Sequence, residues 1–296
     1  MHHLIRTGLA ASLAVLVITS AKLRADDKPA AKKDKPAAKA ASRQQKLIKI
    51  SKETTHLTEP LTKDGYVDYL AALNNQQRKG VTLDNNAAIV FRRALGPGEI
   101  LKEIRVDYFK LLGIDPLPEK GAYFAPFGRF MKDRADAKPD PDRINDLYDK
   151  LSDAMRAPWK AKDTPELAAW LSANRKQLDA IVVGTHRPRL YTPIISPGEE
   201  GEADTGMMVA ALLPAVQEYR GIARALSARA MLSLGNRNVQ QAHDDVMACH
   251  RLARLVGQGP TLIDALVSIA IHSIACQTDT SIAHHGTLTA RQALKF

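Results

Sequence analysis

The spacing of apolar residues restricts the fold more than any other feature of this chain. From Leu57 onward these residues recur with a helical period, and few stretches show the alternation of a half-buried strand. The breaks GNRN and GQGP separate three long apolar segments, for which we expect helices at 207–234, 239–256 and 261–283. The pattern predicts an all-α protein, an irregular multi-helix bundle of antiparallel helical hairpins.

Shorter helices are expected upstream, each bounded by residues that commonly start or stop helices. Thr82 and Thr164 are placed to act as N-caps, and Pro165 fits the first helical position. Residues 114–139 are expected to form a loop whose aromatic side chains fold back onto the helical core. The expected helices are 65–76, 83–95, 98–112, 142–155 and 165–183.

The N-terminus has the parts of a secretory signal. Arg6 precedes the apolar run GLAASLAVLVI at 8–18, and cleavage is expected after Ala21 or Ala25. The run has 11 residues, and because a bilayer span needs roughly 20, a cleaved signal at 1–25 is favoured over an uncleaved anchor. We therefore expect an exported protein, periplasmic or extracellular, with no stable membrane span after cleavage.

Residues 26–56 are expected to form a disordered spacer rich in Lys, Ala and Pro. The unit DKPAAK occurs at Asp27 and again at Asp34, and no large apolar side chain follows before Leu47. Such a segment cannot bury enough surface to offset its ordering entropy. An alternative is that its lysines hold the protein against an anionic cell surface. The helical domain is then expected at 57–296.

The net charge of +10 does not indicate a nucleic-acid partner. Residues 1–52 carry 12 Lys and Arg against 3 Asp, so almost all of the excess charge belongs to the tail. A nucleic-acid-binding domain needs a basic face of its own, with side chains that read or stack on bases. We therefore expect an unknown protein or cell-envelope partner and no nucleic acid.

Residue patterns that carry chemistry are scarce. The 2 cysteines exclude a four-cysteine zinc ribbon and a disulfide-stapled mini-domain. In a helical hairpin centred on GQGP, Cys249 and Cys276 would be offset by roughly 12 Å along the helix axes, too far for a disulfide bond. No HExxH motif occurs. We expect no metal, no cofactor and no catalytic residue, which favours a non-enzymatic protein.

A cluster rich in potential ligands lies on the helix expected at 239–256. His243 and His250 belong to it, together with neighbouring aspartates such as Asp245. Seven residues of helix separate the two histidines by about 10 Å along the axis, too far for both to bind one ion without a third element. We expect the histidines to flank the core and the aspartates to be solvated.

His272 belongs to a polar stripe on the last expected helix, which is otherwise apolar. Asp264, Ser268 and Asp279 share this stripe at helical spacing. The stripe either lines a pocket, with His272 as a ligand-binding group, or forms a partly wet edge of the core. Residues of a single helix cannot form a Ser-His-Asp catalytic triad, because that geometry needs converging elements.

Arg187, Arg189 and Tyr191 are the strongest candidates for ligand binding. They lie in the expected extended segment THRPRLY, where Pro188 stiffens the backbone, and paired arginines suit bidentate binding of a carboxylate or sugar acid. The alternative is that both arginines pair with the carboxylates of PGEEGEAD a few residues downstream. His272 completes the candidate ligand-binding set.

Several segments together resemble uncharacterised exported helical proteins of planctomycete bacteria. The likeness extends over most of the chain after residue 57 and rests on whole phrases, without a catalytic signature. The family has no assigned activity, so the resemblance implies export and a helical fold and transfers no site residue. The segments are DGYVDYLAALN (64–74), DNNAAIVFRRALGPGE (84–99), WLSANRKQLDAIVVGTHRPRLYTPI (170–194) and CHRLARLVGQGPTLIDALVSIAI (249–271).

These observations favour an exported, non-catalytic helical binding or scaffold module whose ligand is unknown. The alternative is an extracytoplasmic hydrolase with a pocket near Arg187, Arg189 and His272. A hydrolase requires a nucleophile or a second carboxylate that another element brings to that pocket.

The C-terminal sequence GTLTARQALKF begins a helix. Thr289 and Gln292 have the spacing of a capping box, but only about two turns of helix follow it. We therefore expect further helices beyond Phe296 to complete the bundle.

Overall fold

The computed structural model describes residues 49–63, 65–134, 141–195, 205–286 and 288–290. The chain divides into two units, Met1–Lys49 and Ile50–Phe296. The expected signal peptide and most of the expected spacer lie outside the described residues, as does the acidic segment at 196–204. Most of the capping box expected at the C-terminus also lies outside them.

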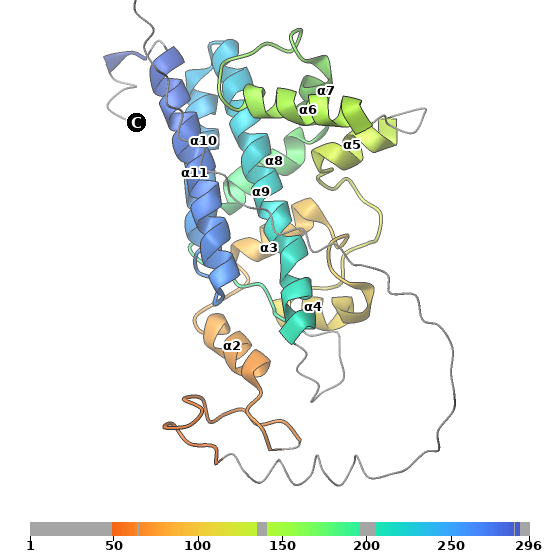
Figure 1. Ribbon diagram of the computed structural model, residues 1–296, viewed down its shortest axis with the longest axis vertical. Coiled ribbons are helices and arrows are strands. Elements are labelled where there is room, and N and C mark those ends of the chain that lie inside the picture. The colour runs from red at the N-terminus through yellow and green to blue at the C-terminus, as the bar shows by residue number, and fades with distance from the viewer. Residues whose placement is uncertain (1–48, 64, 135–140, 196–204, 287, 291–296) are drawn as a thin grey trace, which may run out of the picture. The chain divides into compact units, whose positions relative to one another are not determined.

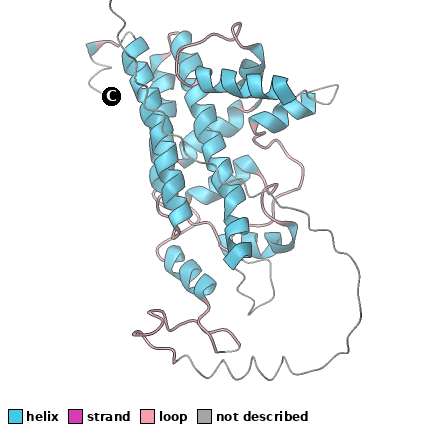
Figure 2. Cartoon of the chain, in the orientation of Figure 1, coloured by secondary structure: helices cyan, strands magenta, loops and turns pink. Residues whose placement is uncertain are grey.

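Helices dominate the described part of the second unit, and no strand occurs in the ranges given above (Figure 2). Two isolated bridges join Leu61 to Val67 and Asn86 to Arg189. The all-α prediction is confirmed. The helices are α2 (Tyr69–Arg78), α3 (Ala87–Leu95), the 3-10 helix η1 (Lys102–Ile104), α4 (Arg105–Leu112), α5 (Phe127–Arg134), α6 (Pro141–Ala154), α7 (Pro165–Ala173), α8 (Arg175–Gly184), α9 (Thr205–Gly235), α10 (Val239–Val256) and α11 (Leu262–His285).

The three C-terminal helices α9, α10 and α11 pack side by side and supply much of the core (Figure 1). Their contact surfaces are rich in fully buried small residues, which let helix axes approach closely. Short breaks at 236–238 and 257–261 reverse the chain between them. The small buried residues are Ala223, Ala225, Ala228, Ala230, Ala242, Ala248, Cys249, Ala253 and Ala275.

A second layer forms where α3 packs against α8. A Cβ on Gly184, the last residue of α8, would lie 2.9 Å from the ring of Phe91 and 3.0 Å from Val90, so the absent side chain permits this approach. Phe91 in turn meets Tyr219 of α9 edge-to-face, with ring centroids 6.0 Å apart. Through Phe91, α3 is therefore joined to the C-terminal helices.

The starts of the shorter helices differ from expectation where side chains form local turns. Thr82 was expected to cap the helix at 83–95, but its hydroxyl accepts from Asn85 N and its own N–H donates to Asn85 Oδ1. That turn delays the helix, and Asn86 is the N-cap of α3. The single helix expected at 98–112 is also wrong, because helical backbone begins only at η1, after the turn at Gly96.

The helix expected at 165–183 is interrupted at Asn174. Its side chain accepts from Ala125 N and donates to Ala125 O and Trp170 O, which separates α7 from α8. The loop expected at 114–139 contains the helix α5. Phe124 and Phe127 pack on Trp170 with ring centroids 6.2 and 5.1 Å apart, so the prediction that loop aromatics return to the core is confirmed for these two.

The outer face of α11 is apolar and exposed. Leu262, Leu266 and Ile269 are 74%, 57% and 65% accessible to solvent. Among the described residues, α11 is the one helix whose length and composition would let it cross a membrane, and core helices of water-soluble proteins share those two properties. Both cysteines are free, Cys249 buried and Cys276 exposed, so the prediction that they are not bonded to each other is confirmed.

Candidate functional site

Arg187 and Arg189 bind the backbone that precedes α3. Nη1 of Arg187 donates to the carbonyl oxygens of Leu83 and Asn86 at 2.7 and 2.9 Å. Nη2 of Arg189 donates to Lys79 O at 3.1 Å. These contacts fasten the segment 185–195 to the turn between α2 and α3. Residues 185–188 form turns and bends, so the extended backbone expected for THRPRLY begins at Arg189. The carboxylates that were the alternative partners of both arginines all lie outside the described residues, within 196–204.

Two buried asparagines hold the next part of the same segment. Asn86 Oδ1 accepts from Tyr191 N at 2.9 Å, and Asn86 Nδ2 donates to Tyr191 O at 3.1 Å. Asn74 of α2 binds Ile194 in the same way: its Oδ1 accepts from Ile194 N at 3.0 Å, and its Nδ2 donates to Ile194 O at 2.7 Å. Each amide side chain replaces a pair of strand hydrogen bonds, so the extended backbone is satisfied without a sheet.

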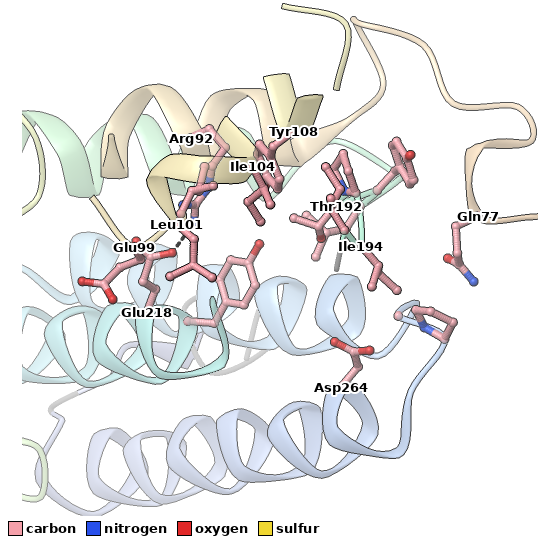
Figure 3. A pocket seen from close by; sticks show the side chains of 18 residues that line it. Gln77, Arg92, Glu99, Leu101, Ile104, Tyr108, Thr192, Ile194, Glu218 and Asp264 are labelled. Carbon is pink, nitrogen blue, oxygen red and sulfur yellow. Dashed lines mark hydrogen bonds and ion pairs between the residues drawn. The ribbon is translucent and has the colours of Figure 1, made fainter. Parts of the chain in front are cut away.

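This fastened segment forms one wall of a cavity of about 90 Å³ (Figure 3). Among the predicted ligand-binding residues, Tyr191 lines the cavity, whereas Arg187, Arg189 and His272 do not. The other walls come from α2, α3, the segment 99–104 that includes η1, α4, α9 and the turn that leads into α11 together with the first turn of that helix. The polar or charged lining side chains are Gln77, Arg92, Glu99, Tyr108, Tyr191, Thr192, Glu218, Tyr219 and Asp264.

The floor of the cavity holds a buried ion pair between Arg92 of α3 and Glu218 of α9. Their side chains are 2% and 8% exposed. Burial raises the pKa of Glu218, Arg92 acts against this shift, and Glu99 adds to it. Burial alone would lower the pKa of Arg92, but Glu218 offsets this effect and the pKa is raised, so the guanidinium stays charged. Nε of Arg92 is buried and has no hydrogen-bond partner among the described residues.

Two further carboxylates surround this pair. Figure 3 shows Glu99 beside Glu218, and Asp264 directed from the start of α11 toward the space between the walls. Glu99 is exposed, and Oδ2 of Asp264 accepts from the Thr261 hydroxyl at 2.6 Å in the capping box of α11. Arg92 is the only basic residue among the described residues that line the cavity. The lining therefore has an excess of negative charge.

Three tyrosines complete the lining, and burial raises the pKa of each of them. Tyr108, Tyr191 and Tyr219 are all less than one-tenth exposed. The Tyr219 hydroxyl is buried without a hydrogen-bond partner among the described residues. Thr192 lies close enough to this hydroxyl to act against the rise in its pKa. The site thus combines aromatic rings, carboxylates and an unsatisfied hydroxyl.

His272 lies elsewhere, at the interface between α10 and α11. Its Nδ1 is 3.2 Å from Nδ1 of His250, and Nε2 of His250 is 2.7 Å from Oδ2 of Asp279. Ser268 of the same stripe donates to Ala253 O of α10 at 2.8 Å. The predicted stripe therefore divides: Asp264 lines the cavity, and the other three members contact α10.

The expectation that the aspartates near His243 are solvated is wrong for Asp245, which is fully buried. Both of its carboxylate oxygens accept from Arg229 of α9, at 2.9 and 2.6 Å. Arg229 also donates to Asp179 of α8 at 2.6 Å. Three helices are joined by this network, and a buried carboxylate with two guanidinium hydrogen bonds is a structural element.

Sequence reasoning missed Arg92, Glu218 and the two buried tyrosines of α4 and α9, because no motif contains them. A usable signal was present for two of them. Arg92 stands at the helical spacing of Ala88 and Leu95, inside an apolar face, and Glu218 interrupts the long apolar segment expected at 207–234. A charged residue on a core-facing position requires a partner, and the two supply each other.

Comparison with protein-family models, with curated proteins and with solved structures finds no match. The function is therefore inferred from the geometry of the site.

Proposed function

We propose that this protein is an exported, non-catalytic binding module whose cavity takes a small organic cation, such as an alkylammonium group. The observation that carries the proposal is the charge of the lining. The described lining residues include three carboxylates, Glu99, Glu218 and Asp264, and one basic group, Arg92. The signal peptide expected at 1–25 favours an extracytoplasmic setting.

The charge of the lining determines the sign of the charge on a ligand that fits the cavity. Arg92 and Glu218 neutralise each other in their buried pair, which leaves the charges of Glu99 and Asp264 without compensation from the other lining residues. In a concave site with low-dielectric walls such charges act at short range and raise the local concentration of cations. Glu99 and Asp264 would repel a carboxylate or phosphate ligand.

The tyrosines select the kind of cation. A ring of Tyr, Trp or Phe attracts a desolvated ammonium group through its quadrupole, and aromatic lining combined with carboxylates is the recurring chemistry of alkylammonium sites. Tyr108, Tyr191 and Tyr219 line the cavity together with Ile100 and Ile104. A volume of about 90 Å³ admits one small group and excludes a large ligand from the floor.

Isothermal titration of the full chain with tetramethylammonium and butylammonium chloride tests the proposal, with sodium acetate and glucose as comparison ligands. We expect binding of at least one ammonium salt and none of acetate. The variant E99Q should weaken this binding several-fold. E103Q is the matched control, because Glu103 is an exposed carboxylate of η1 that does not line the cavity. Binding of acetate in preference to ammonium, or equal effects of E99Q and E103Q, would refute the proposal.

One observation favours a second candidate, an extracytoplasmic hydrolase. Glu218 lies beside Glu99 and burial raises its pKa, and glycoside hydrolysis uses two neighbouring carboxyl groups of which one has a raised pKa. This hydrolase would use these two carboxylates in place of Arg187, Arg189 and His272. Turnover of an aryl glycoside that is abolished in both E218Q and E99Q would favour it over the binding module.

A further inference from the structure

We propose that His250 and His272 together bind a divalent transition-metal ion, through their Nδ1 atoms, at the interface of α10 and α11. The ions that fit are those that accept imidazole readily: Zn²⁺, Ni²⁺ and Cu²⁺. The site is separate from the cavity, since neither histidine lines it. The inference does not depend on the function proposed above.

The spacing of the two nitrogens carries the argument. The two Nδ1 atoms are 3.2 Å apart. Nitrogen ligands lie about 2.0–2.1 Å from Zn²⁺, so two of them on one ion are separated by roughly 2.9 Å at a right angle and roughly 3.4 Å at the tetrahedral angle. The observed separation falls between these values. The distance between the two nitrogens therefore already suits their binding to one ion.

The other nitrogen of His250 is already held as metal sites require. Its Nε2 is 2.7 Å from Oδ2 of Asp279. An ionised carboxylate at that distance keeps the proton on Nε2 and leaves the lone pair of Nδ1 directed away from Asp279. Metal-bound histidines commonly have such a carboxylate partner, which fixes the tautomer and makes the ring a better ligand. Asp279 is thus a positioning residue for His250.

An ion can replace the proton between the two rings without a change in the total number of bound protons. In the metal-free protein, the Nδ1–H group of His272 donates a hydrogen bond to Nδ1 of His250. When an ion binds both Nδ1 atoms, this proton leaves and the outer nitrogen of His272 takes one up from water. Both rings are then neutral ligands and no net proton is released.

The rest of the coordination shell comes from solvent. Among the described residues no third His, Cys, Asp or Glu joins the pair in a group that could hold a metal. The His250 side chain is 18% exposed, and His272 is half-buried, so water reaches the site. Burial lowers the pKa of His272, and His250 and Arg254 add to this effect, so the positive charge of Arg254 lies close enough to oppose a cation here. These features predict a reversible site of moderate affinity, unlike a closed structural zinc site.

Isothermal titration calorimetry of the metal-free full chain with NiCl₂, ZnCl₂ and CuCl₂ tests the assignment. H272Q and H250Q should each remove one bound ion per chain. D279N should keep the site but weaken it by about 10–100-fold, and R254Q should strengthen it by roughly threefold because it removes a nearby positive charge. The gain in R254Q keeps the test decisive if H250Q or H272Q fails to fold.

Two other histidine pairs provide the controls. His284 and His285 lie at the end of α11 with ring centroids 4.6 Å apart, and His2 and His3 lie in the N-terminal tail. A variant with all four replaced by Gln should retain the ion and its response to R254Q. In that variant, electron paramagnetic resonance of bound Cu²⁺ should show two nitrogen ligands. Loss of the ion from this variant, or its retention in H272Q and H250Q, would overturn the proposal.

Discussion

The side chain of Asn86 binds both backbone polar groups of Tyr191, accepting from its N–H at 2.9 Å and donating to its carbonyl oxygen at 3.1 Å. The same Oδ1 accepts from Ala88 N and caps α3. One amide therefore fixes the start of the helix that carries Arg92 and the segment that forms the opposite wall of the cavity.

The variant N86A should destabilise the protein by about 2–4 kcal/mol, because it removes a helix cap and leaves the polar groups of Tyr191 buried without partners. Urea unfolding followed by circular dichroism measures the change. N75A is the matched control, since Asn75 is exposed in α2 and should alter stability by no more than about 0.5 kcal/mol. A similar loss in both variants would contradict the role assigned to Asn86.

The buried ion pair between Asp245 and Arg229 should also stabilise the fold. D245A leaves the guanidinium of Arg229, which is 10% exposed, with Asp179, which is 53% exposed, as its one ion-pair partner among the described residues. We expect a loss of about 3–5 kcal/mol in the free energy of unfolding. D179N should cost much less, because its carboxylate is 53% exposed and solvent screens the pair. Equal losses in the two variants would show that burial does not govern this network.

Helix type and order were predictable from the sequence because apolar period and capping residues are local signals. The bounds of α10 match the expected 239–256, where a clean stripe lies between two strong breaks. Errors arose where side-chain hydrogen bonds decide where a helix begins or ends, within a local turn at Thr82 and over a long range at Asn174. Asn174 ends α7 by binding Ala125, 49 positions away, and no local propensity encodes that contact.

The candidate site was predictable only in part, for the same reason. Tyr191 was identified from its extended segment, and it lines the cavity. Arg92 and Glu218 are 126 positions apart, and His250 and His272 are 22 apart on different helices. Each pair becomes visible only when helix packing is known. Arg187 and Arg189, chosen for their chemistry, bind backbone carbonyls that the sequence could not place next to them.

The raised pKa of Glu218 predicts how stability depends on pH. The carboxyl has an ordinary pKa of 4.5 in the unfolded chain and a higher one in the folded protein. Between the two values the folded state binds more protons than the unfolded state, so stability falls as pH rises through this range and levels off above it. The free energy of unfolding of the wild type minus that of E218Q, measured from pH 4 to pH 8, should decrease with rising pH. An increase would contradict the shift.

The cysteines should differ in reactivity. Cys276 is exposed on α11, whereas Cys249 is buried and burial raises the pKa of its thiol. Because the thiolate is the reactive form, a disulfide reagent should label one thiol per chain in the native protein and two after denaturation without reductant. Detection of no free thiol in a denatured monomer would refute the absence of a disulfide bond.

Two glycines of α9 should respond to alanine in opposite directions. At Gly235 a Cβ would lie 2.0 Å from the carbonyl oxygen of Trp159, whose indole nitrogen donates to Ala228 O at 3.1 Å and holds that loop against α9. Because the clash is with backbone, either the loop or the helix would have to move, and we expect G235A to destabilise the protein by about 2–3 kcal/mol.

The opposite result is expected at Gly221, where nothing lies within 4 Å of a Cβ. G221A should therefore stabilise the helix by about 0.5–1 kcal/mol, the difference in helix propensity between the two residues. Thermal unfolding of the two variants beside wild type gives both signs in one experiment. A destabilised G221A would mean that this part of α9 contacts a surface that the described residues do not include, and a neutral G235A would mean that Trp159 does not pack on the end of α9.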